Sequence, residues 1–405
     1  MNVSKVTEGS KGALKNVRIV DLTRVWAGPL GTRVLADFGA DVIKVSDPRM
    51  PISAWGKVNN KLNRNKRNIG LRLDTETGRN ILFDLISVSD IVIENFRPRV
   101  MRNLELTYNV LCKVNPSIIM CSMPGYGLTG PYSEYPAFGS TAEAISGINS
   151  MLGYSENEPI QTGLSYADPI SGLNSVSMVM AMLRKRILTG KGSHVELALA
   201  DSPIGTLGEF FVATSAGAGN TSILSNKHDH MSPHGVYKTR GDDQWIAIAI
   251  KTDEEWKKLV SMIGDERLKS PSFKHTTDRK ENEIFIDSCI SEWSTLMNRD
   301  DAMNLLQANQ IAAAAILNNL EVLENKHLNE RDFFTLMTEK NYGEQKYDGQ
   351  SIPGHKKSKS NWFPMNELGE STDQILNHLL GKKTDETKIY YQENQTLGRD
   401  ETEIK

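Results

Sequence analysis

The sequence is poor in cysteine, and its three cysteines, Cys112, Cys121 and Cys289, lie far apart and form no C-x-x-C pair. This excludes a disulfide framework and a sulfur-based zinc site, and it is typical of a reducing compartment. The first ten residues carry no apolar core of the kind found in a secretory signal. No apolar run is long enough to span a membrane. We therefore expect a cytoplasmic protein with no membrane partner.

Neither sign of charge is in large excess. The chain has 47 Lys and Arg and 50 Asp and Glu residues, which gives a net charge of −3. A general binder of nucleic acid or of a membrane surface carries a strongly basic balance, so neither is expected as a partner. A chain of 405 residues with 39% hydrophobic side chains is globular and too long for a single ordinary core. We expect about two domains.

Several motifs of nucleotide, hydrolase and metal sites are missing. Gly28–Gly31 is not a G-x-G-x-x-G fingerprint, and neither a Walker motif nor a G-x-S-x-G elbow occurs, which argues against NAD, a P-loop and a serine hydrolase. His228, His230 and His234 could be read as a metal site. However, their segment has no thiolate, and Pro233 interrupts any helix that would align the imidazoles. No metal site is predicted.

The first half of the chain alternates between strand and helix patterns. The expected strands are Val17–Thr23, Asp41–Ser46, Ile91–Glu94 and Ser117–Ser122, and the expected helices are Gly28–Phe38, Thr77–Val88 and Leu104–Val114. Strand, helix and strand with short joints form right-handed units of a parallel sheet. The sequence therefore predicts a doubly wound, Rossmann-like α/β domain.

A joint rich in glycine, serine and asparagine, Gly217–Ser225, predicts a domain boundary. Beyond it, Gly235–Arg240 and Gln244–Ile250 predict a β-hairpin across Gly241-Asp-Asp. Helical patterns follow at Glu254–Ile263, Glu281–Leu296 and Arg299–Asn309. This region is expected to form a smaller α+β domain.

Two basic segments, Lys57–Arg67 and Arg97–Arg102, are expected in loops beside strands, where α/β sheets bind their ligands. Their charges could hold phosphates, and the interspersed asparagines could bond a base or a ribose. A solvated surface is the alternative. The residues alone leave both interpretations open.

Asp168 lies on a glycine-flanked loop just before an apolar, helix-like run, Leu173–Ile187. Asp followed by Pro169 is typical of a helix start, where the carboxylate accepts from free amides and the positive helix end favours its charge. Such a carboxylate could be a nucleophile that attacks an acyl group. It could equally be only the N-cap of the helix, and the local sequence leaves both open.

Seven stretches carry a family resemblance in one order along the chain. They are Val20–Pro29, Leu35–Val45, Asn65–Asp74, Ile91–Pro98, Gly125–Pro131, Thr189–Gly192 and Pro233–Tyr237. Together they resemble the family III CoA-transferases, the CaiB/BaiF family that contains formyl-CoA transferase and carnitine CoA-transferase. The resemblance runs from about Val17 to the C-terminal helices.

This resemblance implies a large Rossmann-like domain built from both chain ends, 1–216 and 329–405, with a linker and small domain, 217–328, inserted between them. It also implies an interlocked homodimer and no permanently bound cofactor, with a coenzyme A thioester and a free carboxylic acid as substrates. The family's catalytic aspartate lies where this sequence has Asp168. The nucleophile interpretation is therefore favoured over the cap.

The resemblance also implies residues that bind the substrates. For CoA it points to Asn95 and Phe96 beside the pantetheine and adenine, with Lys66 and Arg67 nearby. Two departures from the family pattern make Arg49 and Arg102 further candidates for phosphate contact. The substrate-binding candidates, at or beside the acyl site, are Trp26, Phe138 and Gly235. Gly235 ends the segment Ser225–Gly235, which is rich in histidine where some members have a mobile glycine loop.

The mechanism implied is transfer of CoA through an aspartyl-CoA thioester at Asp168, with succinyl-CoA or another dicarboxylyl-CoA as the expected donor. One alternative is a 2-methylacyl-CoA racemase of the same fold. Racemases carry a catalytic histidine where this chain has Phe138, which cannot transfer a proton. A second alternative is a non-catalytic CoA-binding protein, against which the intact Asp168 loop argues.

Overall fold

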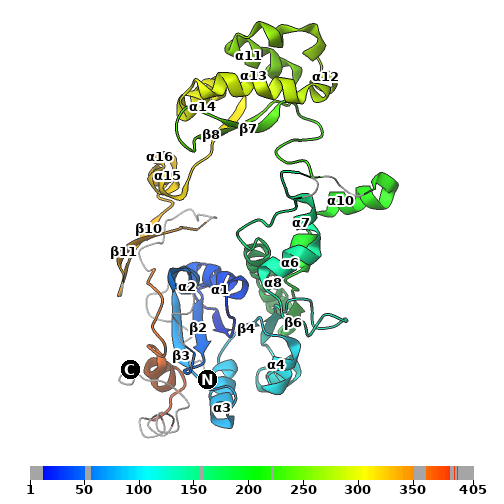
Figure 1. The fold of residues 1–405 in the computed structure, drawn as a ribbon. Helices are drawn as coiled ribbons and strands as arrows, with labels where there is room; N and C mark the ends of the chain where they lie inside the picture. Colours follow the sequence, from blue (N-terminus) through cyan, green and yellow to red (C-terminus); the bar gives the residue numbers. More distant parts are fainter. Residues whose placement is uncertain are drawn as a thin grey trace. The chain divides into compact units, whose positions relative to one another are not determined.

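The computed structural model describes residues 12–50, 56–155, 158–219, 223–340, 342–350, 362–383, 387 and 390 (Figure 1). Its contacts divide the chain into two compact units. The first comprises Met1–Asn149, Gln161–Gly219 and Asp332–Lys405, and the second comprises Ser150–Ile160 and Asn220–Arg331. The predicted domains, 1–216, 217–328 and 329–405, stay a prediction. The contact division places Ser150–Ile160 with the second unit.

A six-stranded parallel sheet forms the centre of the first unit. Its strands are β1 (Arg18–Asp21), β2 (Asp41–Ser46), β3 (Lys66–Gly70), β4 (Ile91–Glu94), β5 (Ile119–Ser122) and β6 (Ser193–Glu196), in the order β3-β2-β1-β4-β5-β6. All residues of β1, β4 and β5 are buried, as expected for a parallel sheet covered on both faces. The predicted α/β class with a parallel sheet is confirmed. The strand order reverses between β1 and β4, the point where such sheets bind ligands.

Helices cover the sheet through two apolar clusters. The helices of this unit are α1 (Ala27–Asp37), α2 (Gly56–Asn63), α3 (Glu76–Ser87), α4 (Pro98–Asn103), α5 (Tyr108–Val114), α6 (Gly139–Ser146), α8 (Ala167–Thr189), α9 (Asp201–Ile204), α10 (Gly208–Ala213) and the π-helices η2 (Thr214–Ala218) and η6 (Gln374–Leu379). The short helix α7 (Ile148–Met151) contains residues of both units. One cluster joins alternate strand residues to α1 and α8, and the other joins the remaining strand residues to α3, α5 and η6. Successive strand residues point to opposite faces, so both faces are apolar.

The segment Lys57–Arg67 was predicted as a basic loop, and this prediction is wrong. The structure forms α2 and then β3 there. Charged residues can be accommodated in this strand because buried carboxylates form ion pairs with them. Arg67 contacts Asp41 on the neighbouring strand β2, and Lys66 contacts Asp21 on β1, one strand further away. Alternation of apolar residues could not reveal a strand that begins with Lys66 and Arg67.

The second unit contains a three-stranded antiparallel sheet of β7 (His234–Lys238), β8 (Trp245–Ala249) and β9 (Ala312–Ala315) in that order. Its other elements are α11 (Asp253–Ile263), η3 (Glu266–Lys269), η4 (Pro271–Phe273), α12 (Thr276–Glu281), α13 (Glu283–Thr295), α14 (Arg299–Ala308), α15 (Asn319–Glu324) and α16 (Lys326–Glu330). The predicted hairpin is confirmed as β7 and β8. Tyr237, Ile246 and Ile248 pack with the helices in one apolar core.

After the second unit, β10 (Thr335–Glu339) pairs antiparallel with β11 (Gly343–Tyr347). Among the described helices, none is both long and apolar enough to cross a bilayer.

Candidate active site

Asp168 lies where the first residues of three helices meet. It is the second residue of α8, its side chain is only 6% exposed, and its Oδ1 accepts from the amide of Ala27 at 3.2 Å. A second amide, that of Gly139, also donates to this carboxylate. Ala27 begins α1 and Gly139 begins α6. Because free amides and the positive end of the dipole lie at a helix N-terminus, this junction favours an anion.

The interpretation of Asp168 as the N-cap of its own helix is wrong. The residue before α8 is Tyr166, and Asp168 bonds to amides of other helices. The carboxylate is thus held by tertiary contacts to Ala27, 141 residues earlier in the chain, and to Gly139, 29 residues earlier, a geometry that a local capping motif cannot predict.

The surroundings of Asp168 also change its acidity. Burial raises the pKa of Asp168 to about 6, Glu143 contributes to the rise, and the amides of Ala27 and Gly139 oppose it. Among the described residues, no Lys, Arg or His nitrogen lies within 4.0 Å of this carboxylate. A buried carboxylate with amide donors and no cation is typical of a functional group. The side chain is ionised above about pH 6, and protonated below it.

Small residues allow the helices to approach closely enough for these contacts. A Cβ added at Gly139 would lie 2.0 Å from Asp168 Oδ2, and one at Gly172 would lie 2.7 Å from the carbonyl of Ala27. A Cβ at Gly31 would lie 2.3 Å from Ser175 Oγ, so α1 and α8 also meet closely one turn further on. Larger residues would separate the helices and move the Ala27 amide from Asp168.

Lys66, predicted near CoA, lies inside the first unit. Its side chain is 1% exposed, and its ammonium donates to Asp21 at 3.0 Å and to the carbonyl of Pro29 at 2.9 Å. Burial lowers the pKa of Lys66 to about 7, with Asp21 acting against the fall. Asp21 also accepts from Thr23 and Thr32. This network holds the loop that leads from β1 into α1.

Arg67, the second basic candidate of this segment, contacts Asp41 through two bonds of 2.9 and 2.7 Å. Both positive charges are therefore already matched by carboxylates in the structure. A buried ion pair of this kind holds neighbouring strands in register, since removing one partner leaves the other charge unpaired.

Asn95 and Phe96 follow β4 and contact the loop that follows β1. The Asn95 side chain accepts from the Arg24 amide and donates to the Arg24 carbonyl, both at 2.8 Å. The Arg24 guanidinium lies 5.2 Å from the centre of the Phe96 ring. Arg24 is exposed and forms no ion pair with any described residue. Sequence reasoning missed Arg24, although it lies within the matching stretch Val20–Pro29.

Arg49 and Arg102 lie on the surface, after the carboxyl ends of β2 and β4. The Arg49 guanidinium contacts Asp47 at 2.7 Å and Asp74 at 3.1 Å. Arg102 pairs with Glu134. Exposed pairs like these exchange partners at little cost, so both arginines can accept a phosphate.

Trp26 and Phe138 immediately precede the two residues whose amides reach Asp168, Ala27 and Gly139. Trp26 is half-buried, and Phe138 is 56% exposed. The structure therefore brings together the main chain at three predicted positions. These are Asp168 and the two aromatic residues, Trp26 and Phe138, that precede its amide donors in the sequence.

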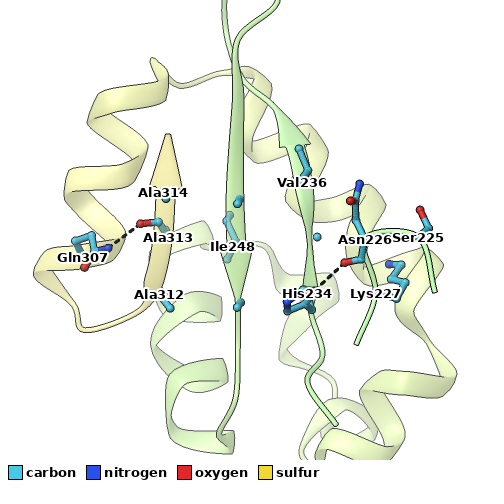
Figure 2. A pocket seen from close by; sticks show the side chains of 13 residues that line it. Ser225, Asn226, Lys227, His234, Val236, Ile248, Gln307, Ala312, Ala313 and Ala314 are labelled. Carbon is cyan, nitrogen blue, oxygen red and sulfur yellow. Dashed lines mark hydrogen bonds between the residues drawn. The ribbon is translucent and has the colours of Figure 1, made fainter. Parts of the chain in front are cut away.

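Gly235 belongs to β7 in the second unit, where it lines a cavity of about 470 Å³ (Figure 2). The sheet face lining this cavity is rich in alanine, and its other lining residues include Asn226, Lys227 and His234. His234 Nδ1 bonds to the carbonyl of Asn226 at 2.7 Å. In the described part of the chain, no group of three potential ligands could hold a metal ion.

Comparisons with known proteins bear on the whole chain. Residues 14–371 match the family model described as CoA-transferase family III. The chain is 28% identical to the succinyl-CoA–L-malate CoA-transferase β subunit of Chloroflexus aurantiacus, over 91% of this chain and 94% of that relative. It is 29% identical to the succinate–glutarate CoA-transferase of Agrobacterium fabrum, over 77% of this chain and 81% of that relative.

Among solved structures, the fold is similar to the crystal structure of a CAIB/BAIF family protein from Brucella suis. The TM-score is 0.82 at 27% identity, and the match covers 91% of this chain and 99% of the other. The likeness therefore extends over the fold as a whole and is not limited to one motif.

Proposed function

The chain belongs to CoA-transferase family III and is a CoA-transferase, and from this premise we propose that Asp168 is the nucleophile that carries CoA between two acids. The family resemblance predicted from the seven stretches is confirmed. The single observation that carries the assignment to Asp168 is its geometry. It is a buried carboxylate with a raised pKa, held by the first amides of two other helices and, among the described residues, paired with no cation.

The proposed reaction begins when an Asp168 oxygen attacks the thioester carbonyl of the donor. The carbon–sulfur bond breaks, CoA leaves as a thiolate, and a mixed anhydride joins Asp168 to the donor acid. The thiolate then attacks the Asp168 carbonyl, which releases the donor acid as a carboxylate and leaves an aspartyl-CoA thioester. The free energy of the thioester is conserved in each step, so no nucleotide triphosphate is required.

The second half reverses these steps with the acceptor acid. Its carboxylate attacks the aspartyl carbonyl and expels the thiolate, and the thiolate then attacks the acceptor carbonyl and expels Asp168. Each attack on the aspartyl carbonyl places a negative charge on oxygen. The amides of Ala27 and Gly139 already point at this group and can stabilise that charge.

For the CoA portion we propose a site at the carboxyl edge of the sheet, around the reversal between β1 and β4. Asn95 and Phe96 fix Arg24 there, and the Arg24 guanidinium forms no ion pair within the described part of the chain. Arg49 and Arg102 are exposed after β2 and β4, the strands on either side of β1, and supply further positive charge for phosphates. Lys66 and Arg67 instead hold Asp21 and Asp41, and so support the site from within.

The donor we propose is succinyl-CoA or another dicarboxylyl-CoA. The names of several relatives support this choice, since they specify succinyl-CoA with malate, citramalate or mesaconate. We also propose that the chain acts as an interlocked homodimer, as the resemblance implies, and that Gly235 contributes to the acyl site. The acceptor is a free carboxylic acid.

Two measurements test this function. A panel of free acids with acetyl-CoA and succinyl-CoA, read by mass spectrometry of the CoA products, identifies donor and acceptor. Quenching with borohydride or hydroxylamine during turnover, followed by peptide mapping, is expected to place the adduct on Asp168. Asp168→Asn should abolish turnover and retain CoA binding, while Asp201→Asn, at an exposed aspartate of α9, should have no effect. Persisting activity with residue 168 unmodified would contradict the proposal.

A further inference from the structure

A second buried carboxylate, that of Glu143, interacts electrostatically with Asp168 and has no part in the proposed reaction steps. Glu143 is on α6, one helical turn after Gly139, and is 1% exposed. Its two carboxylate oxygens lie 3.1 and 3.0 Å from the Thr162 hydroxyl, which donates to them. Among the described residues, no Lys, Arg or His nitrogen lies within 4.0 Å of Glu143. A buried charge without a cation is costly, so its retention calls for a reason.

Thr162 connects Glu143 to the loop that delivers Asp168. This loop contains two residues in the left-handed region, Gly163 with φ 76° and Ser165 with φ 47°. The carbonyl of Ser165 accepts from the Asp168 amide at 2.9 Å. A non-glycine residue at positive φ is strained and persists only when its surroundings fix it. The bond from Thr162 to Glu143 fixes the start of this loop.

Glu143 also acts on Asp168 through its charge. It is the one charged side chain that contributes to the raised pKa of Asp168, in addition to burial. Two nearby carboxylates disfavour each other's ionised forms. Acylation by the donor thioester removes the negative charge from Asp168 and places it on the departing thiolate. The repulsion with Glu143 is relieved in that step, as it is when Asp168 is protonated.

We propose, on the basis of the proposed function, that Glu143 is a positioning residue that anchors the Asp168 loop through Thr162 and favours the acylated, uncharged state of Asp168. Glu143 touches no reacting atom in this scheme. It acts through Asp168, so its removal should slow formation of the adduct and make Asp168 a stronger acid.

Charged groups on the surrounding elements do not contribute to the raised pKa of Asp168. The elements packed against α6 and α8 include α1, α9, β5 and β6. Their charged and titratable side chains are Arg33, Asp37, Cys121, His194, Glu196 and Asp201. None of these contributes to the raised pKa of Asp168, and Arg33 is paired with Asp37. The comparison of variants can therefore be limited to Glu143 and Thr162.

The test compares Glu143→Gln with Thr162→Val in the full-length protein. Glu143→Gln keeps an acceptor for Thr162 and removes the charge, whereas Thr162→Val keeps the charge and removes the anchor. Two quantities are measured. One is the infrared titration of the Asp168 carboxyl without substrate, assigned with Asp168→Asn. The other is the rate of adduct formation with succinyl-CoA in single turnover.

Glu143→Gln is expected to lower the pKa of Asp168 and to slow adduct formation several-fold, because the repulsion that acylation relieves is then absent. Thr162→Val is expected to slow adduct formation and to leave the pKa of Asp168 unchanged. An unchanged titration in Glu143→Gln would overturn the charge effect. An unchanged rate in Thr162→Val would overturn the anchor, and this variant remains informative if Glu143→Gln does not fold.

The proposed function can fail separately from this inference. If the wild-type adduct forms at another residue, Asp168 is not the nucleophile. The infrared titration would still show whether Glu143 raises the pKa of Asp168, because it requires neither substrate nor turnover.

Discussion

Asn95 bonds to the main chain of Arg24 on both sides, accepting from its amide and donating to its carbonyl, each at 2.8 Å. This pair joins the loop after β4 to the loop after β1. The two strands are neighbours at the point where the strand order of the sheet reverses. A single amide side chain therefore helps to set where the exposed guanidinium of Arg24 lies, beside the Phe96 ring.

Replacing Asn95 by Ala should raise the Michaelis constant for the acyl-CoA donor about tenfold, since two hydrogen bonds that fix Arg24 are lost. The kcat should change less, because Asp168 and its donors remain in place. Steady-state kinetics with varied donor measure both constants. Asn103→Ala, at an exposed position on α4, is the matched control. Equal constants in both variants would remove Asn95 and Arg24 from the CoA site.

Asp168→Asn should stabilise the protein at pH 8 and have little effect at pH 4. The folded-state pKa of about 6 lies above the ordinary value of 3.8, so the folded state binds the proton more tightly than the unfolded state does. The wild-type free energy of unfolding therefore falls as pH rises from about 4 to 6, by up to about 3 kcal/mol. Chemical denaturation of both proteins at the two pH values measures the difference. A variant that is less stable at pH 8 would contradict this sign.

Gly139→Ala should reduce kcat at least 100-fold, because the added Cβ would overlap Asp168 Oδ2 and displace the carboxylate. Single-turnover adduct formation should fall by the same factor, and circular dichroism should show a folded protein. The control is Gly208→Ala, where a Cβ meets nothing within 4 Å. Normal adduct formation in Gly139→Ala would mean that Asp168 reacts from another position.

Lys66→Met should lower the free energy of unfolding by about 3 kcal/mol, since Asp21 loses a buried partner. The Michaelis constant for CoA substrates should stay near the wild-type value in the folded protein. Lys61→Met removes a lysine whose side chain is 43% exposed, and it should cost less than about 1 kcal/mol. The opposite pattern, a raised Michaelis constant at unchanged stability, would return Lys66 to the CoA site.

A transferase without a proton-transfer group at the acyl carbon should not exchange hydrogen at C2 of its substrate. Phe138 occupies the position that the resemblance gives to the racemase histidine, and phenylalanine cannot move a proton. We expect no deuterium in a chiral 2-methylacyl-CoA incubated with the protein in deuterated water without an acceptor acid. Mass spectrometry detects the exchange, and its presence would favour the racemase alternative.

The sequence predicted the sheet where apolar residues alternate or run together, as in β1, β2, β4 and β5. It did not predict β3, because Lys66 and Arg67 look solvated until the carboxylates of β1 and β2 that pair with them are known. Such pairing depends on strand order, and strand order is a tertiary property.

The candidate site was also predicted only in part from the sequence. Asp168 was identified through the resemblance, while the local pattern suggested a cap that the structure does not contain. Glu143 carries no signal in a helical stretch, since its burial and its proximity to Asp168 arise only when α6 meets α8. The roles of the remaining candidates in binding CoA stay predictions.

The last helical segment completes the first core. Ile375 and Leu376 of η6 are fully buried against the sheet, in one cluster with Val20 and Ile43 near the start of the chain. The second unit is encoded between these two parts. During synthesis on the ribosome, one apolar face of the sheet therefore stays incompletely covered until the whole inserted unit has been made. The nascent chain can close that face only after residue 376 has left the exit tunnel.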